Sequence, residues 1–230
     1  MNQHMRPEPV PFYDLGSQRR RLGTSIDEAI SRVTSHCLFI NGPEVKLFQQ
    51  ELEQHLGIKH VIPVANGTDA LQIAMMALGL KPGDEVITPC FTYIATAEVV
   101  ALLQLKLVLV DVDPETFNMN PELIEKAITP RTKAIVPVHL FGQCAEMEPL
   151  QRIAASAGIP IVEDACQAIG AEYQSRRAGV LGTIGCFSFF RTDLASSDVS
   201  PSGRTRPWKR SHSELSVTDR KSTRLNSSHT

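Results

Sequence analysis

Short apolar runs alternate with longer segments of helical period from residue 60 to residue 190. The apolar runs are continuous rather than alternating, which is typical of strands that other elements cover on both faces. Strand and helix in this regular succession predict crossover units and an α/β fold, with a mostly parallel central sheet and helices on both faces. The predicted strands are 60–65, 84–89, 105–112, 133–140, 159–164 and 184–190, and the predicted helices are 68–80, 92–104, 120–128 and 146–158.

Two more helices are predicted before the first strand. The segment 24–36 carries apolar residues at helical spacing, and 42–57 begins with Pro43 in its first turn and ends on a glycine. We expect both to belong to an N-terminal helical arm of about residues 1–57. No repeat or low-complexity linker interrupts the pattern, so we interpret residues 1–190 as one α/β domain.

The composition is that of an ordinary soluble protein. Of the 230 residues 42% are hydrophobic, and the formal net charge is -2. This balance requires neither a nucleic acid nor a membrane as a partner. Apolar runs stay far short of the roughly 20 residues that span a bilayer, and the N-terminus lacks the order of a signal peptide. We therefore expect a cytoplasmic protein.

The pattern breaks after residue 190. Residues 1–190 carry a net charge of -6, whereas residues 191–230 carry +4, and 15 of those last 40 residues are Ser or Thr. Such a segment buries too little apolar surface to offset its conformational entropy, so we expect it to be disordered. The stretch DRKSTRLNSSH near its end is similar to a translated sequencing adapter. We therefore expect a frame-shifted or adapter-derived tail.

The five cysteines lack the C-x-x-C spacing of zinc sites and redox motifs. Most fall inside apolar stretches, so we expect buried thiols without a disulfide framework. Metal binding is therefore not part of the predicted function.

Ligands bind beyond the carboxyl ends of parallel strands, and small or polar residues stand at each predicted strand end. The first group is Asn66-Gly67-Thr68-Asp69, directly before a helix. Gly67 allows a close approach of the backbone, and the N–H groups of the first helical turn attract an anion such as phosphate. An equal alternative is that Thr68 or Asp69 caps the helix. The stretch is neither G-x-G-x-x-G nor a Walker loop, so it indicates no dinucleotide or triphosphate site.

Glu163 and Asp164 stand where a buried strand leaves the sheet. A carboxylate at this depth needs a cation or hydrogen-bond donors as partners. Two interpretations stay open for Asp164: it caps a following helix, or it stabilises a protonated ring nitrogen.

Three more strand-end residues are candidates whose ordinary role is structural. Tyr93 forms one wall of a flat pocket or packs in the core. Ser188 offers its hydroxyl to a ligand or to the backbone. His139 is a base or, more often in proteins, a core histidine with satisfied hydrogen bonds.

Together and in this order, the motifs resemble the DegT/DnrJ/StrS family of nucleotide-sugar aminotransferases, which use pyridoxal 5'-phosphate (PLP). The resemblance covers residues 11–190 and rests on PFYDL, FINGPEV, ANGTDALQIAMMALGLKPGDEVITP, FTYIATAE, AIVPVHLFGQ, VEDACQAIGA and IGCFSFF. It implies a large domain of the aspartate aminotransferase type, fold type I of the PLP-dependent transferases, incomplete at the C-terminus. PLP is the cofactor that it implies.

The resemblance also implies a role for each matching residue. Backbone and hydroxyl groups would hold the cofactor phosphate, an aromatic ring would stack on the pyridine, a carboxylate would keep the ring nitrogen protonated, and an amide would lie near the phenolic oxygen. The phosphate-binding residues would be Gly67, Thr68, Asp69 and Ser188, and the others would be Tyr93, Asp164 and Gln167. A protonated ring is the electron sink that transamination needs.

By the same resemblance the reaction has two halves. An amino acid, commonly glutamate, gives its amine to PLP, and the pyridoxamine form then aminates a keto-sugar carried on a nucleotide diphosphate. Enzymes of this kind serve cell-surface polysaccharide or amino-sugar biosynthesis and generally work as homodimers.

One position departs from the family pattern. After a stretch such as SFF the family continues with two residues and then the lysine that forms the Schiff base with PLP, but here Asp193 stands in that place. A carboxylate forms no imine and does not replace the lysine as a proton shuttle. We therefore expect the chain as written to be inactive, a fragment truncated before the Schiff-base lysine.

Three alternatives stay open. A PLP-dependent sugar dehydratase would have histidine in place of the lysine. A non-catalytic binder would hold PLP or a nucleotide sugar without reacting, which Asp193 favours. A nicotinamide oxidoreductase is the third, and the missing G-x-G-x-x-G with an acidic residue about 20 positions further on counts against it.

Overall fold

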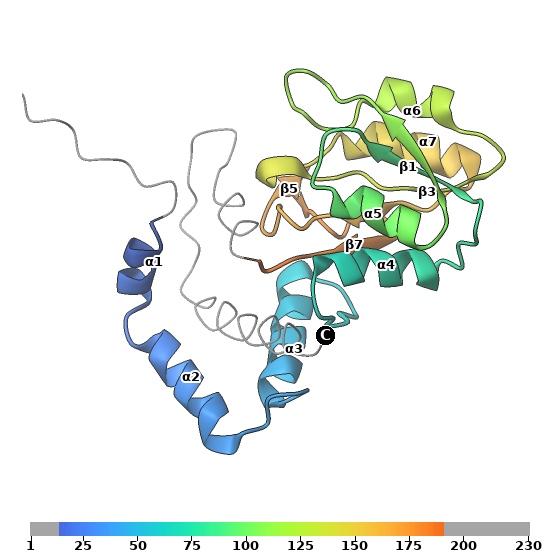
Figure 1. Ribbon diagram of the computed structural model, residues 1–230. Helices are drawn as coiled ribbons and strands as arrows, with labels where there is room; N and C mark the ends of the chain where they lie inside the picture. The colour runs from blue at the N-terminus through green and yellow to red at the C-terminus, as the bar shows by residue number, and fades with distance from the viewer. Residues whose placement is uncertain (1–13, 191–230) are drawn as a thin grey trace, which may run out of the picture.

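Seven α-helices and a short 3-10 turn are found in the computed structural model, which describes residues 14–190 (Figure 1). The helices are α1 (Leu15–Leu22), α2 (Ser25–His36), α3 (Pro43–Leu56), α4 (Gly67–Ala77), α5 (Ala95–Leu102), α6 (Pro121–Ala127) and α7 (Met147–Ala157), and the 3-10 turn is η1 (Leu140–Gly142). The sequence predicted the six helices from α2 to α7, with α2 expected at 24–36 and α3 at 42–57. It did not predict α1.

The strands that position the site are all parallel. They are β1 (Glu85–Pro89), β2 (Lys106–Val110), β3 (Thr132–Ile135), β4 (Val162–Asp164) and β7 (Ile184–Cys186). Ladders give the orders β2-β1-β3 and β4-β7, and parallel bridges from Ile135 to Ile161 and from Val138 to Asp164 join the two groups. The carboxyl ends of these strands therefore lie along one edge, called the carboxyl edge below; the opposite edge is the amino edge.

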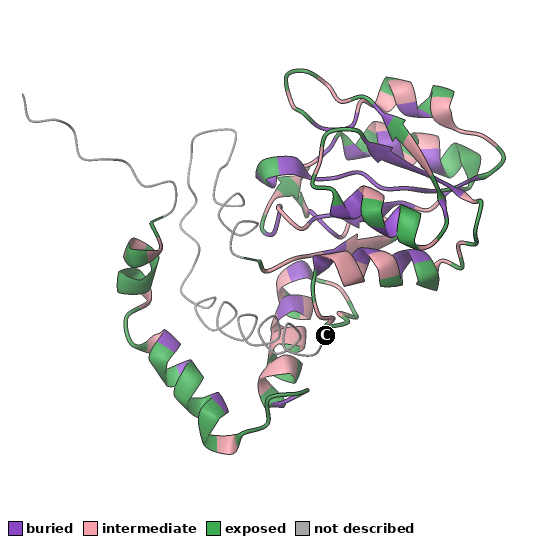
Figure 2. Cartoon of the chain, viewed as in Figure 1, coloured by how far each residue is buried: buried purple, intermediate pink, exposed green. Residues whose placement is uncertain are grey.

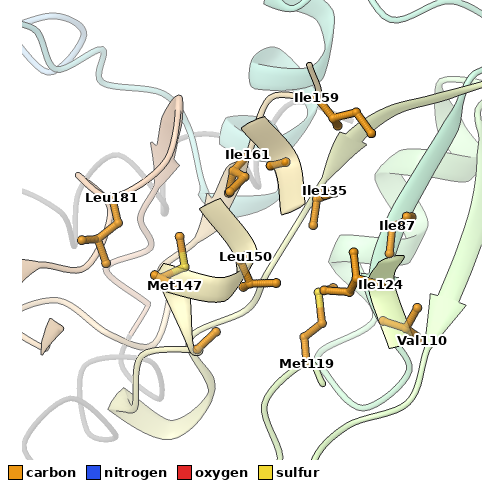
Figure 3. Packing of buried hydrophobic residues seen from close by; sticks show 12 residues of the cluster. Ile87, Val110, Met119, Ile124, Ile135, Met147, Leu150, Ile159, Ile161 and Leu181 are labelled. Carbon is orange, nitrogen blue, oxygen red and sulfur yellow. The ribbon is translucent and has the colours of Figure 1, made fainter. Parts of the chain in front are cut away.

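Neighbouring residues on the central strands point to opposite faces of the sheet. Val86 and Val162 pack among residues of α4 and α5, whereas Ile87 and Ile161 pack among residues of α6 and α7. Figure 3 shows the second of these clusters, in which Leu150 of α7 lies over the strands. Figure 2 shows β1 buried between the two helical layers, whereas most of β2 is half-buried or exposed. The predicted α/β architecture, with a parallel sheet covered on both faces, is confirmed.

The prediction of a strand at 60–65 is wrong. Residues 60–64 pair with no strand among residues 14–190, and the Ile62 side chain is 76% exposed. A strand needs a neighbour to satisfy its backbone groups, and the sheet order ends at β7 without one for this segment. Pro63, which has no N–H, weakens the segment further. The last strand is also shorter than predicted, and a small antiparallel hairpin, β5 (Glu172–Tyr173) with β6 (Arg176–Arg177), was not predicted.

The helices of the expected N-terminal arm differ in how they meet the rest of the chain. In Figure 1, α1 and α2 lie away from the sheet, and Figure 2 shows them mostly exposed. The next helix, α3, packs through Leu52 and Leu56 against Ile169, and its Phe48 ring meets Phe189 edge-on at 4.9 Å between centroids. The domain limits at 1–190 stay a prediction, and the expected tail 191–230 lies outside the described residues.

Among residues 14–190, no helix combines the length and the apolar character that crossing a bilayer would require. The cysteines are not uniformly buried, because Cys37 and Cys90 are exposed. Both lie where an element ends, Cys37 just after α2 and Cys90 just after β1, so the apolar sequence around them does not bury them. Burial does raise the pKa of the Cys144 thiol, to about 12.

Candidate active site at the carboxyl edge

A cavity of about 1180 Å³ runs along β7 between α3, the segment 60–65 and α4, and reaches the carboxyl edge at the start of α4, the segment before α5 and the ends of β4 and β7. Its lining gathers residues from far apart in the chain. Six of the seven residues expected to bind a cofactor line it: Gly67, Thr68, Tyr93, Asp164, Gln167 and Ser188. Asp69 is not among the lining residues, and Asp193 lies outside the described residues.

The first turn of α4 is capped by Asn66. Its side-chain oxygen accepts a hydrogen bond from the Asp69 N–H at 2.9 Å, and its side-chain nitrogen donates to the Asp69 carboxylate at 3.1 Å. The cap is therefore neither of the two residues weighed from the sequence. It leaves the N–H groups of Gly67 and Thr68 without an acceptor among residues 14–190, at the helix end where an anion is stabilised.

Gly67 brings this helix end against the last described strand. A Cβ atom built on Gly67 would lie 2.8 Å from the Cys166 sulfur and 2.9 Å from the Ser188 Cβ, closer than side chains tolerate. Glycine is thus required for the approach. The Ser188 hydroxyl stands beside it and accepts a hydrogen bond from the Phe190 N–H at 3.2 Å, with its own proton left to donate. Two amides and one hydroxyl therefore converge at this end of the cavity.

Asp164 is the last residue of β4 and only 5% exposed. Its backbone is fixed by the neighbouring strand segment: its N–H donates to the Pro137 carbonyl at 2.9 Å, and its carbonyl accepts from the His139 N–H at 3.0 Å. No helix follows it, so the alternative of a helix cap is wrong; the chain makes turns there instead. The carboxylate accepts from the Thr96 hydroxyl at 2.7 Å and from the Cys166 N–H at 3.3 Å.

The number of donors separates Asp164 from the other buried carboxylates. A carboxylate has about four acceptor positions. Glu163 fills four, with the His139 ring and three backbone N–H groups. Glu85 also fills four, with one hydroxyl and two cationic side chains. Asp164 fills two and pairs with no cation among residues 14–190, so it keeps acceptor positions for a further donor.

His139 is a core histidine, the more common of its two predicted roles. It is fully buried, its Nδ1 accepts from the Ala145 N–H at 3.1 Å, and its Nε2 lies 2.8 Å from the Glu163 carboxylate. Because Nδ1 accepts, the ring proton is assigned to Nε2, which donates to Glu163. Neither residue of this pair lines the cavity. The pair instead fixes backbone segments next to it, through the N–H groups of Ala145, Gly179, Leu181 and Gly182.

The remaining wall offers an aromatic ring, a hydroxyl and an amide. The Tyr93 side chain is 69% exposed and lines the cavity, so the pocket-wall interpretation holds over core packing. Beside it, the buried hydroxyl of Thr92 has no hydrogen-bond partner in the described part of the chain. The Gln167 side-chain oxygen accepts from the Phe141 N–H at 3.0 Å, which also braces Phe141 in a left-handed conformation with φ of 54°.

These groups fit a molecule such as PLP. An orphaned hydroxyl, two unused helix-terminal amides and a carboxylate with spare acceptor positions share one cavity. A ligand with an anionic group at one end and a protonated ring nitrogen at the other would satisfy the two amides and the carboxylate.

Three residues of the site were missed from the sequence, and the capping role of a fourth, Asn66, was not recognised. Asn66 could have been found, since Asn-x-x-Asp before a helix is a reciprocal capping pattern. Thr96 could not, because it meets Asp164 over a separation of 68 residues. Thr92 and Phe141 carry no local signal for an orphaned hydroxyl or for a braced left-handed backbone.

Solved structures share this fold. A DegT DnrJ EryC1 StrS aminotransferase from Brucella abortus matches with a TM-score of 0.77 and 45% identity, over 80% of this chain and 51% of that one. The E. coli GDP-4-keto-6-deoxy-D-mannose-3-dehydratase, solved with bound hydrated PLP, matches with a TM-score of 0.69 and 30% identity, over 72% and 44%. The fold is therefore that of a PLP-dependent transferase, the large-domain type that was predicted.

The chain belongs to the DegT/DnrJ/EryC1/StrS aminotransferase family, whose model matches residues 21–196. Among curated relatives, the UDP-2-acetamido-2-deoxy-3-oxo-D-glucuronate aminotransferase of Pseudomonas aeruginosa is 54% identical over 181 residues, which are 79% of this chain and 50% of that protein. The chain thus spans about half the length of the curated relatives that it matches.

Proposed function

We propose that this chain is the cofactor-binding part of a PLP-dependent aminotransferase. The enzyme would transfer an amino group from an amino acid, with glutamate as the first candidate donor, to a keto-sugar nucleotide. The donor leaves as its 2-oxo acid, and the sugar carbonyl becomes a primary amine. The observation that carries the proposal is Asp164, a buried carboxylate that keeps spare acceptor positions and lines the same cavity as the unused amides of Gly67 and Thr68.

Each residue of the site would bind a different part of the cofactor. The N–H groups of Gly67 and Thr68 and the Ser188 hydroxyl would bind the phosphate, with Asp69 acting through the helix cap. Asp164 would accept the ring N–H, and Tyr93 would cover the ring from the open side. Gln167 would reach the phenolic oxygen from the β4 side of the cavity. When bound, PLP supplies the electron sink for breaking and making the bonds at the amino carbon.

The names of the relatives support a substrate class. The 54% identical protein is named for a UDP-linked 3-oxo sugar acid, which supports a UDP-linked keto-sugar as the acceptor here. We further propose that the full-length protein acts in the cytoplasm, in polysaccharide or amino-sugar biosynthesis, as a homodimer. Exposed aromatic residues at the carboxyl edge, Phe91 and Phe117 with ring centroids 5.6 Å apart, are a surface that a second copy would cover.

Asp193 defines the limit of the proposed activity. A chain with aspartate at this position is expected to bind the cofactor without forming the covalent link, and so to be inactive as written. A lysine at 193 would mark a transferase, and a histidine would mark a dehydratase.

The first test is equilibrium dialysis of the 230-residue chain with pyridoxamine 5'-phosphate, which has no aldehyde and does not react with surface lysines. Pyridoxamine, without the phosphate, is the matched control. We expect saturable binding of the first at one site per chain and at least tenfold weaker binding of the second, because the α4 terminus has lost its anion. Equal binding of both, or none of either, overturns the proposal.

A second test concerns position 193. The variant Asp193→Lys and the parent chain are treated with PLP and borohydride and then mapped by mass spectrometry. Labelling at residue 193 in the variant supports the proposed site of the lysine. Labelling of other lysines alone contradicts it.

A further inference from the structure

We infer that Thr96 is a positioning residue that aims the Asp164 carboxylate at the ring nitrogen of the bound cofactor. The inference rests on the proposed function and adds to it a residue that would not touch the cofactor itself. It begins from a hydrogen bond between two elements far apart in the chain: the Thr96 hydroxyl donates to Oδ2 of Asp164 at 2.7 Å, and both residues are buried.

The Thr96 hydroxyl is committed to this contact. Thr96 is the second residue of α5 and is 0% exposed. A threonine in a helix ordinarily bonds to a carbonyl three or four positions earlier, as Thr34 does with Ile30 and Ser31 in α2. Thr96 makes no such bond, and its proton goes to Asp164 instead. Its branched Cβ also restricts the rotation that would break the contact.

This hydrogen bond fixes a torsion that is otherwise soft. The terminal torsion of an aspartate side chain has broad minima, so a buried backbone alone does not set the plane of the carboxylate. Here Oδ2 is held by Thr96 and Oδ1 by the Cys166 N–H at 3.3 Å, from opposite ends of the group. The shorter of the two contacts comes from Thr96. Without it, the carboxylate turns or takes up water, and a directional N–H···O bond from a ring weakens.

The amino edge holds a matched control. There the Thr129 hydroxyl donates to the Glu85 carboxylate, which is also buried, at the other end of the sheet. Neither residue lines the cavity. Replacing Thr129 by valine therefore removes the same chemical contact, a threonine hydroxyl on a buried carboxylate, without touching the proposed site.

The test compares two ligands on the 230-residue chain: pyridoxamine 5'-phosphate and its analogue with CH in place of the ring nitrogen. The analogue keeps the phosphate and the ring but offers nothing to Asp164. In Thr96→Val we expect roughly tenfold weaker binding of pyridoxamine 5'-phosphate and less than about twofold for the analogue. Thr129→Val is expected to leave the ratio of the two affinities unchanged, although it lowers the melting temperature.

A second pair of variants protects the test against loss of folding. Thr96→Ser and Thr96→Ala both remove the methyl group, so they differ from each other only by the hydroxyl. The serine variant should keep the wild-type affinity ratio, and the alanine variant should lose it. Equal weakening of both ligands in the valine and alanine variants would mean a merely structural role and would overturn the inference.

Failure of the proposed function gives a different result. If the wild-type chain binds the two ligands equally well, Asp164 does not contact the ring nitrogen, and the role of Thr96 is overturned together with it. If the wild-type chain binds neither ligand, the proposed cofactor site itself is wrong.

Discussion

Each edge of the sheet holds a buried carboxylate that accepts a hydrogen bond from a threonine hydroxyl, but the two carboxylates differ in their other partners. At the amino edge, Glu85 also pairs with Arg131 at 2.7 Å and with Lys106 at 3.2 Å, so its charge is neutralised within the fold. At the carboxyl edge, Asp164 has the hydroxyl of Thr96 and one N–H, and no cation among residues 14–190. The hydrogen-bonding capacity of Glu85 is therefore filled by the protein itself, whereas Asp164 can accept a further hydrogen bond from a ligand.

This contrast explains why burial alone did not identify the site. Glu85 and Glu163 are at least as buried as Asp164, and their acceptor positions are filled by the protein. What sets Asp164 apart is unfilled hydrogen-bonding capacity on the wall of a cavity. A buried acceptor is costly when it lacks donors, so this arrangement favours a ligand that supplies one.

The largest expected effect is at Glu163, which shares β4 with Asp164 and holds the chain behind the site. Glu163→Ala leaves the Nε2 proton of His139 and three backbone N–H groups without an acceptor. We expect the free energy of unfolding to fall by at least about 4 kcal/mol, because each of these four buried donors costs about 1–3 kcal/mol without a partner. Urea denaturation measures it, with Glu163→Gln as the milder control. A loss below about 1 kcal/mol would contradict the network described.

The next effect concerns the approach of α4 to β7. Gly67→Ala places a methyl group against the Cys166 sulfur and Ser188, so we expect a loss of about 1–3 kcal/mol of stability and weaker binding of pyridoxamine 5'-phosphate. Denaturation and dialysis together measure both. Gly16→Ala, inside the exposed helix α1, is the control and should be neutral or stabilising. Unchanged ligand affinity in Gly67→Ala would separate this contact from phosphate binding.

Replacing Asp164 by asparagine removes the charge and keeps the shape. We expect the affinity for pyridoxamine 5'-phosphate to fall by about tenfold, because a charged acceptor binds a donor more strongly than an amide does. Asp111→Asn, an exposed carboxylate at the same edge and outside the cavity lining, should change the affinity by less than about twofold. The two dialysis curves decide the matter: similar losses in both variants would point to a general effect of charge.

The smallest effect is the pH dependence at the amino edge. The Thr129 hydroxyl, then the Arg131 guanidinium, lower the pKa of Glu85 from 4.5 to about 2. Since the folded-state pKa is depressed, the stabilisation is present above pH 4.5 and is lost as the pH falls towards 2. Thermal melts of the wild type and Glu85→Gln should therefore converge over that window. Curves that stay parallel there would count against the ion pair.

The sequence was sufficient for elements whose signal is local. Continuous apolar runs located β1 and β4 because both faces of the sheet are covered there, and proline and glycine located the ends of α3. The segment 60–65 has the same apolar composition but lacks a neighbouring strand. Whether a segment pairs with another strand cannot be predicted from that segment alone.

The site divides in the same way. Gly67, Tyr93, Asp164, Gln167 and Ser188 were predicted to form one site because each stands in a motif near a predicted strand end, and all five line the cavity. The residues that position them were not predicted. The contact of Thr96 with Asp164, for example, depends on how α5 crosses the sheet.

The contact between Gly67 and Ser188 also sets an order of assembly. Gly67 is made early during synthesis, and Ser188 only after the chain has passed through all five parallel strands of the sheet. A nascent chain that ends before β7 has the sheet's centre but no place for a phosphate. Since a ligand that binds only the finished state stabilises that state alone, cofactor capture would act as the last step of folding and would favour chains in which β7 has joined the sheet.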